Sequence, residues 1–316
     1  MNILPHEKQI FDYEETLSKV KDQNNKSFIW SAAEIKKLEK KLEKLKKRVY
    51  SSLSPMDRIA ISRHPNRPHS LDYINNVFTE KEEIFGDRTF QDDKSIISFL
   101  CKKDNQKFVV VAQEKGRDTN TRIFRNFGMP HPEGYRKALR VMKLAEKFSI
   151  PIISLIDTPG AFHGLSAEER GQGFIIANNL FEMAKIKTPI FVVIIGEGCS
   201  GGALAMAIGD VIAMLEHSYY SVISPEGCSS ILFKDQKKND ISSKILKLNS
   251  EFLLENGIID NVIAEPFGGA HLNHNEIFES FKNFIDNSYE SYKQFDLTHL
   301  LNKRYEKFRN IGKFLS

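Results

Sequence analysis

Apolar and polar positions alternate along the chain in the pattern of an α/β protein. An uninterrupted apolar run at residues 190–195 and a mainly apolar run at 151–156 predict strands that are buried on both faces of a sheet. Helical periodicity at 134–148 and 168–184 separates these runs, which favours a parallel sheet with helical crossovers. Further strands are predicted at 96–100, 108–112, 210–215 and 220–223, the first two joined as a hairpin by a polar turn.

A Lys-rich helix is predicted near the N-terminus. Ser31 and Glu34 have the spacing of a capping box, and apolar residues then recur three and four positions apart. This seam predicts a helix that packs either on its own domain or on a partner subunit, and Pro55 ends it. We therefore expect a helical extension over residues 1–55, a subunit contact, followed by one domain over 56–316 that includes C-terminal helices. The seam consists of Ile35, Leu38, Leu42, Leu45 and Val49.

Composition indicates a globular chain with a large core. The 316 residues are 41% hydrophobic and 27% charged, and no apolar run reaches the roughly 20 residues of a membrane helix. Without a recognisable signal or transit sequence, we expect a cytoplasmic protein that does not enter membranes. Three widely spaced cysteines without a CxxC pair predict that the chain binds no metal.

The net charge of +4 is concentrated in one segment. Residues 34–48 contain eight Lys or Arg and three Glu, which gives +5 and leaves about −1 for the remainder. The basic pI is therefore a property of one helix and does not indicate a nucleic-acid-binding protein. Nucleic-acid binding by that helix stays open.

The sequence GEGCSGG at 196–202 follows a predicted strand and precedes a short helical segment, and three chemistries could use such a turn. The spacing of Gly196, Gly198 and Gly201 matches a dinucleotide-binding fingerprint, with Glu216 about 20 residues further on. Only residues 202–209 separate the turn from the next strand, however. A crossover helix needs more chain, so this interpretation is disfavoured.

The same turn contains a G-x-S-x-G sequence, which is typical of hydrolase nucleophiles. Ser200 would then attack the substrate, and the acid would be Asp260. The candidates for the base are His217, His271 and His274.

The third interpretation uses only the backbone. Gly201 and Gly202 could direct their N–H groups at a developing oxyanion, because glycine allows a close approach. A structural glycine turn without chemistry is the alternative.

Elsewhere, the segment 113–133 carries cations that indicate either an anion-binding or partner-binding surface or a solvated loop. They are Lys115, Arg117, Arg122 and Arg125.

Ordered motifs over nearly the whole chain carry a family resemblance. They are RHPNRP with LDYI (63–74), GDRTFQDD (86–93), RNFGMPHPEGYRKALR (125–140), IDTPGAF (156–162), ERGQ (169–172), GEGCSGGALA (196–205), YSVISPEGC (220–228) and EPFGGAH (265–271). With these motifs, the chain resembles the alpha-subunit family of the bacterial-type acetyl-CoA carboxylase carboxyltransferase.

This resemblance implies an α/β, crotonase-like fold of repeated ββα units. It implies an α2β2 assembly with a beta subunit that carries a zinc ribbon. Such an enzyme transfers the carboxyl group from carboxybiotin, held on a biotin carboxyl carrier protein, to acetyl-CoA. The product is malonyl-CoA for fatty-acid synthesis, and a separate biotin carboxylase uses ATP.

The resemblance also implies the roles of six site residues. The backbone N–H groups of Gly201 and Gly202 would form an oxyanion hole for the carboxyl donor, and the beta subunit's turn would hold the acetyl-CoA enolate. The carboxybiotin pocket would include Gly160, Gly198, Arg170 and Gln172.

The sequence departs from the family pattern at some positions. Cys199 stands where the family often has Gly or Ser, and Gln113 replaces a common histidine. Phe162 and His163 replace the usual Tyr-Pro. The rival functions are a serine hydrolase, a non-catalytic scaffold, and a self-sufficient acyl-CoA hydratase or isomerase that would use Glu197.

Overall fold

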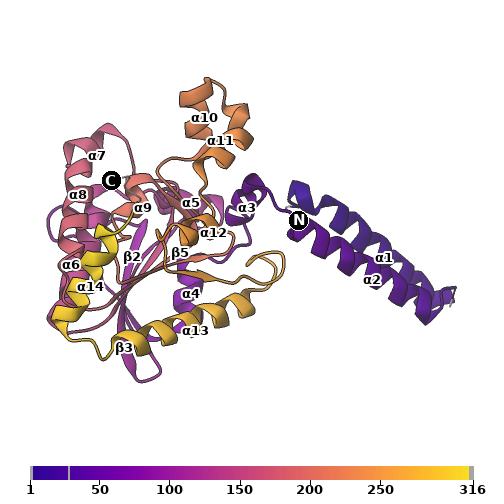
Figure 1. Cartoon of the computed structure of the whole chain (residues 1–316), viewed down its shortest axis with the longest axis horizontal. Helices are drawn as coiled ribbons and strands as arrows, with labels where there is room; N and C mark the ends of the chain where they lie inside the picture. Colours follow the sequence, from indigo (N-terminus) through magenta and orange to yellow (C-terminus); the bar gives the residue numbers. More distant parts are fainter. Residues whose placement is uncertain (1–2, 28, 313–316) are drawn as a thin grey trace.

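The computed structural model of the chain describes residues 3–27 and 29–312 and centres on one eight-stranded sheet (Figure 1). The order along the sheet is β1-β2-β3-β4-β5-β6-β8, and β7 pairs with β5. The strands are β1 (Thr79–Glu83), β2 (Ile96–Lys103), β3 (Gln106–Gln113), β4 (Ile152–Thr158), β5 (Ile190–Cys199), β6 (Val211–Leu215), β7 (Tyr219–Ser221) and β8 (Asn261–Ile263).

The predicted strand arrangement is confirmed. Strands β2 and β3 form the expected antiparallel hairpin, and β1 pairs antiparallel with β2. From β3 to β6 and β8 every pairing is parallel, as alternating strands and helices predict. Strand β5 is longer than predicted, because its last three residues continue the ladder by pairing with β7.

Helices connect the strands and cover the sheet. The α-helices are α1 (Lys8–Ser27), α2 (Ala32–Tyr50), α3 (Pro55–Ser62), α4 (Ser70–Val77), α5 (Thr119–Phe124), α6 (Pro132–Lys147), α7 (Leu165–Glu169), α8 (Gln172–Met183), α9 (Ser200–Leu204), α10 (Pro225–Phe233), α11 (Asn239–Leu246), α12 (Ser250–Glu255), α13 (His274–Tyr292) and α14 (Leu297–Arg309). Short 3₁₀ helices are η1 (Pro5–Glu7), η2 (Asn126–Gly128) and η3 (Gln236–Lys238). Among the described residues, no helix combines the length and apolar character needed to cross a membrane.

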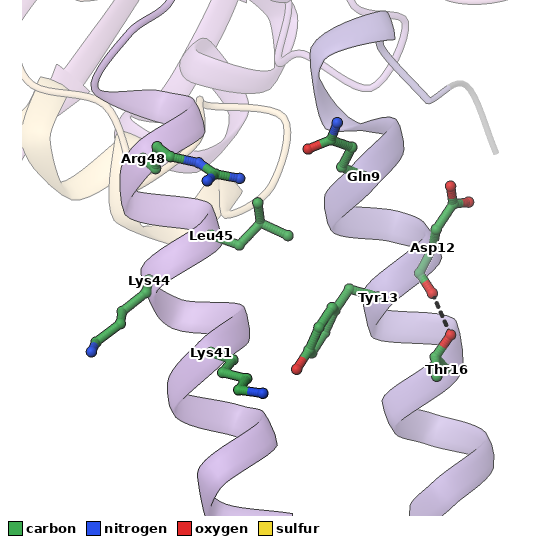
Figure 2. Close-up of a pocket in the computed structure, with 8 residues that line it drawn as sticks. All are labelled: Gln9, Asp12, Tyr13, Thr16, Lys41, Lys44, Leu45 and Arg48. Carbon is green, nitrogen blue, oxygen red and sulfur yellow. Dashed lines mark hydrogen bonds between the residues drawn. The ribbon is translucent and has the colours of Figure 1, made fainter.

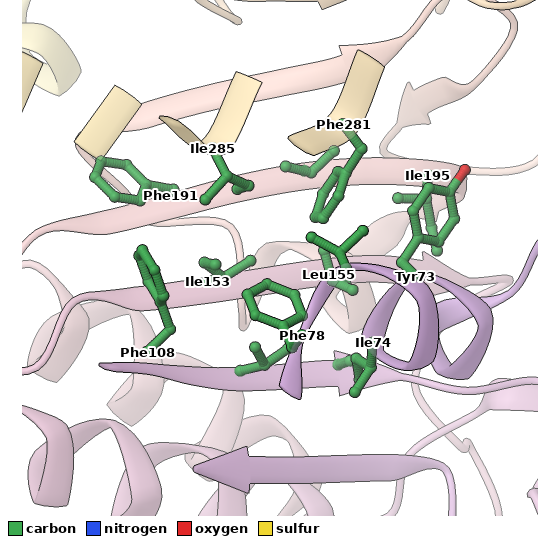
Figure 3. Close-up of a cluster of buried hydrophobic side chains, with 14 of the residues drawn as sticks. Tyr73, Ile74, Phe78, Phe108, Ile153, Leu155, Phe191, Ile195, Phe281 and Ile285 are labelled. Carbon is green, nitrogen blue, oxygen red and sulfur yellow. The ribbon is translucent and has the colours of Figure 1, made fainter. Parts of the chain in front are cut away.

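Two apolar cores lie on opposite faces of the sheet. Along β5, Phe191, Val193 and Ile195 join one core, whereas Ile190, Val192 and Ile194 join the other, as the strand's alternation requires. Side chains of α4 and α13 complete the first core, where aromatic rings pack on the strands (Figure 3). Helices α6 and α8 complete the second. Burial on both faces explains the unbroken apolar run at 190–195.

The N-terminal helix has the predicted capping box. The Ser31 side chain accepts from the Glu34 N–H, while the Glu34 carboxylate accepts from the Ser31 N–H. The seam of α2 packs against α1 of the same chain, a helix that the sequence did not predict. The two helices form a hairpin that projects from the body (Figure 1).

One contact closes the base of this hairpin. The Tyr50 hydroxyl donates a 2.9 Å hydrogen bond to the Glu7 carboxylate, which also lies 3.4 Å from His271 of the body. The division into 1–55 and 56–316 stays a prediction. Residues 1–2, 28 and 313–316 of those ranges lie outside the described residues.

Candidate active site

The carboxyl ends of β3, β4 and β5 lie side by side and carry the segments singled out from the sequence. Strand β5 runs through Gly196 to Cys199, with Thr158 of β4 opposite Gly198. The prediction of a glycine turn over 196–202 is therefore wrong for its first half. The chain turns only at Ser200, where φ is +60°, and α9 begins there.

Gly202 is enclosed by the exit segment of β4. A Cβ atom at this position would lie 2.3 Å from the backbone N of Ala161 and 2.5 Å from the carbonyl carbon of Gly160. These are backbone atoms that cannot move without shifting the segment. Only glycine therefore lets α9 and residues 157–162 approach so closely.

Two buried side chains bind the Gly202 carbonyl. Gln113, at the end of β3, donates from its amide nitrogen at 2.8 Å, and the Tyr135 hydroxyl of α6 donates at 3.1 Å. The amide oxygen of Gln113 also accepts from the Asp157 N–H at 3.2 Å. Gln113 thus connects the ends of β3, β4 and the start of α9, although the sequence had marked it only as a departure from the family.

The backbone N–H groups of Gly201 and Gly202 lie in the first turn of α9. The first N–H groups of a helix have no acceptor within that helix, so they are available to other acceptors. Ser200 is exposed, Gly201 is half-buried, and a Cβ atom at Gly201 would make only ordinary contacts, at 3.6 Å from Ile176.

A cavity of about 490 Å³ opens beside Ser200 and Gly201. Its wall is mainly apolar, which suits a ring or an acyl chain of an organic ligand. The remaining lining residues are Leu204, Tyr220, Ser221, Val222, Leu246, Lys247, Phe252, Leu253 and Ile258.

Behind the turn lies a cluster of ion pairs. Lys115 lies 2.7 Å from Asp157 and 3.5 Å from Glu197, and Arg63 bridges Glu197 at 2.8 Å and Glu226 at 2.7 Å. The cluster ties α3, three strand ends and α10 together around a smaller cavity of about 230 Å³. One signal in the sequence could have indicated it: each of the two buried carboxylates follows an apolar strand run closely.

Opposite charges decide the ionisation of this cluster. Burial raises the pKa of Asp157, but the Lys115 ammonium outweighs burial and holds that pKa below its ordinary value. Burial likewise lowers the pKa of Lys115, and the carboxylates of Asp157 and Glu197 reverse this and raise it. Both partners of the pair are therefore charged at neutral pH.

The cations predicted to form an anion-binding surface at 113–133 are largely paired within the chain. Lys115 is buried in the cluster, Arg117 pairs with Asp72 at 2.5 Å, and Arg125 donates to the Lys94 carbonyl. Arg122 lines the smaller cavity. The four cations therefore do not gather into one surface patch.

Two of the four predicted pocket residues lie at the turn. Gly160 adopts φ +144° against Gly202, and Gly198 is buried in β5, where a Cβ atom would lie 3.1 Å from Ile194, Tyr219 and Tyr220. Close packing favours glycine at 198, whereas at 160, where an added Cβ atom would meet no neighbour within 4 Å, the positive φ favours it.

The other two bind neighbouring segments of the chain. The Arg170 guanidinium pairs with Glu133 at 3.0 Å and lies over the Phe90 ring. The Gln172 amide nitrogen donates to the carbonyls of Pro130 and Phe162, both at 2.8 Å. Gln172 therefore positions the exit segment of β4.

The serine hydrolase interpretation is not supported. Among the described residues no histidine is bonded to exposed Ser200. His217 is buried, with its backbone N–H bonded to Glu265, and His271 lies beside Glu7. The His274 ring bonds the Asn66 carbonyl, and Asp260 pairs with Lys307.

The dinucleotide and hydratase interpretations also lack their geometry. Helix α9 spans five residues, too few for a crossover, and the Glu216 carboxylate accepts from the Glu265 N–H at 3.2 Å. Glu197, the acid required by a hydratase, is held by Arg63 and Lys115. In the described part of the chain, no group of three His, Cys, Asp or Glu side chains could hold a metal ion.

Comparison with known proteins identifies full-length relatives. Residues 3–312 match a family described as acetyl co-enzyme A carboxylase carboxyltransferase-like. The acetyl-coenzyme A carboxylase carboxyl transferase subunit alpha of Chlamydia caviae is 56% identical over 312 residues, 99% of this chain and 96% of that protein. The protein of the same name from Chlamydia trachomatis serovar L2 is 54% identical over the same length and coverage.

Solved structures support the same fold at lower identity. The transcarboxylase 12S structure with methylmalonyl-coenzyme A and methylmalonic acid bound has a TM-score of 0.59 and 16% identity, over 73% of this chain. The beta subunit of Pseudomonas aeruginosa geranyl-CoA carboxylase has a TM-score of 0.55 and 12% identity, over 80%. The match spans only 42% and 45% of those chains. The expected crotonase-like α/β fold is confirmed.

Proposed function

The chain belongs to the acetyl-CoA carboxylase carboxyltransferase family as an alpha-type member, and we propose that its turn at Gly201 and Gly202 stabilises negative charge during carboxyl transfer. As a biotin-dependent carboxyl transferase, the enzyme forms malonyl-CoA from acetyl-CoA. Carboxybiotin, on its carrier protein, supplies the activated carboxyl group.

The close packing of Gly202 on Gly160 is the observation that carries this proposal. It fixes the first turn of α9, and thereby the two N–H groups, beside an apolar cavity of about 490 Å³. Fixed donors need no reorganisation when charge develops, and one such donor is worth about 2.7–4 kcal/mol in the transition state. The cavity wall is suited to hold the carboxyl donor, and the glycines leave room for its polar atoms.

The roles of the remaining predicted residues follow from their contacts. Gln113 and Tyr135 hold the carbonyl side of the turn, and Gln172 holds the exit segment of β4. Gly160 places its backbone against Gly202, Gly198 allows close packing within β5, and Arg170 supports α6 through Glu133. In this proposal these groups orient the donors and do not transfer protons.

The proposal needs a second chain. A zinc-ribbon beta subunit would hold the acetyl-CoA enolate in an α2β2 assembly, and a biotin carboxylase would consume ATP to recharge the carrier. The described residues of this chain place no carboxylate–histidine pair at Gly201 and Gly202. The absence of such a pair supports a site that a second chain completes. Localisation of this complex to the cytoplasm is part of the proposal, and cell fractionation would test it.

Reconstitution tests the proposed function. The chain is purified alone and together with a beta-type subunit, and malonyl-CoA formation from acetyl-CoA and carboxybiotin is measured. We expect product only when both chains are present. If this chain alone formed product, the shared site would be contradicted. If the assembled pair formed none, the proposed function would be contradicted.

A further inference from the structure

The two faces of the α1–α2 hairpin differ in their ion pairs. On one face the helices are bridged by Lys46 with Glu14, at 2.5 Å, and by Lys21 with Glu39, at 2.6 Å. The other face has no such bridge among the described residues. The charged residues of one face are therefore paired within the hairpin, whereas no such pair joins the helices on the other face that the structure describes.

The unbridged face forms a groove of about 700 Å³ (Figure 2). Leu45 of α2 and Tyr13 of α1 point into the space between the helices and give it an apolar floor. No residue of α2 is fully buried by α1, so its apolar seam is only half covered. A helix with a half-covered seam gains stability when a further helix packs on it.

The rim of the groove is cationic. Lys41, Lys44 and Arg48 form no ion pair with any residue that the structure describes, and the one carboxylate beside them is Asp12. The groove thus carries a net charge of about +2 at neutral pH. Charge of this kind attracts carboxylates and repels basic segments.

One polar atom in the groove lacks a partner. The Tyr13 hydroxyl is shielded from solvent and makes no hydrogen bond within the described part of the chain. Buried hydroxyl groups in folded proteins are almost always hydrogen-bonded, so the Tyr13 hydroxyl is a free donor for an acceptor that reaches it when a partner packs on the groove.

We propose that this groove binds an acidic amphipathic helix of the companion beta-type subunit, which forms a three-helix bundle with α1 and α2. An apolar stripe would cover Leu45, flanking carboxylates would pair with the cationic rim, and one acceptor would reach the Tyr13 hydroxyl. This is helix-in-groove recognition, in which apolar contacts supply affinity and charges set the orientation. The identity of the partner rests on the proposed function.

Paired charge reversals test the proposal. Lys41→Glu with Arg48→Glu changes the groove, whereas Lys36→Glu with Lys40→Glu makes the same change in net charge at exposed positions outside it. Each full-length variant is titrated with the beta-type subunit, and the dissociation constant is measured at several salt concentrations. Circular dichroism of each variant checks that the hairpin is folded.

We expect the groove variant to weaken association by about tenfold or more and to reduce its salt dependence, and the control to change affinity less than about threefold. Equal affinities for the two variants would overturn the proposal. So would an effect only on self-association of this chain, since a second copy would then occupy the groove, or an effect only on binding of a duplex RNA probe.

A further measurement separates this inference from the proposed function. At saturating beta-type subunit, the groove variant should form malonyl-CoA at the wild-type rate, because the changed residues lie outside the site. If the groove variant bound the beta-type subunit normally but lost turnover at saturation, the groove would not be a docking site. The proposed reaction of the wild-type pair would still stand. If the wild-type chain bound the beta-type subunit tightly but the pair formed no malonyl-CoA, the proposed function would be contradicted and the groove assignment would not.

Discussion

The side-chain amide of Gln113 donates a 2.8 Å hydrogen bond to the carbonyl oxygen of Gly202, 89 residues further along the chain. The same amide accepts from the Asp157 N–H, so one side chain fixes the relative positions of three strand exits. Because both groups are buried, neither can exchange this bond for one with water. The precision of the proposed donors thus depends on a residue that does not itself contact the cavity.

Gln113→Leu should lower kcat for malonyl-CoA formation by about tenfold. It leaves two buried backbone groups with fewer partners, at a cost of about 1–3 kcal/mol, and loosens the turn. Gln113→His, which can still donate one hydrogen bond, should recover part of the loss without a change in KM. Gln294→Leu, at an exposed position, is the matched control. A normal kcat for Gln113→Leu would exclude a positioning role.

Gly202→Ala and Gly201→Ala should differ sharply although they are neighbours. The new methyl group at Gly202 meets backbone atoms at 2.3 and 2.5 Å, whereas at Gly201 its nearest neighbour lies 3.6 Å away. We expect turnover to fall about 100-fold for Gly202→Ala and only severalfold for Gly201→Ala. Both are measured in the assembled pair, with association followed by sedimentation. Similar turnover for the two variants would contradict the packing argument.

Ser200→Ala should retain turnover within about threefold, because no base lies beside the hydroxyl. Ser200→Gly should also raise the free energy of unfolding by about 1 kcal/mol, since glycine adopts φ +60° without strain. Turnover and urea unfolding of both variants provide the measurements. A large loss of turnover in Ser200→Ala would return the hydroxyl to the mechanism.

Glu265 should make the stability of the protein depend on acid pH. Burial raises its pKa, but the paired Arg67 guanidinium outweighs burial and lowers that pKa to about 2 from an ordinary 4.5. The ionised pair therefore stabilises the fold above about pH 4.5, and this contribution, about 3 kcal/mol, disappears as pH falls toward 2. Urea unfolding between pH 2 and 6 measures it.

Glu265→Gln should flatten this pH dependence and lower stability at neutral pH, because Arg67 remains buried without its partner. The loss at pH 7 should be about 3–5 kcal/mol. Glu255→Gln, at an exposed position of α12, serves as the control and should change neither quantity. If the free energy of unfolding of Glu265→Gln changed with pH as in the wild type, other carboxylates would be responsible for the loss of stability in acid.

Local sequence patterns predicted most of the sheet, but they placed the start of the principal turn four residues too early. The apolar run at 190–195, the hairpin of β2 and β3 and the capping box at Ser31 each depend on neighbouring residues, and each is confirmed. Helix α1 was not predicted, because its few apolar residues are scattered among polar ones and its main packing partner is α2, which is remote from local patterns. The extension of β5 to Cys199 depends on pairing with β7. The last residues of β5 belong to a glycine-rich segment that would not form a strand without this partner.

The contacts that hold the site could not be predicted from local patterns. Lys115, Asp157, Glu197 and Arg63 meet because four elements converge. The places of Asp157 and Glu197 after apolar strand runs hint at one sheet edge, but nothing local shows that Lys115 and Arg63 pair with them there. The family resemblance implied roles for the glycines of the site. It did not indicate that Gln113 would hold the Gly202 carbonyl.

The bond between Glu7 and Tyr50 brings together two residues 43 positions apart at the point where the chain enters and leaves the α1–α2 hairpin. Glu7 also lies 3.4 Å from His271 of the body, so a single carboxylate joins both helix ends to the domain that carries the sheet. A partner that binds along the hairpin is therefore oriented relative to the sheet through this one junction.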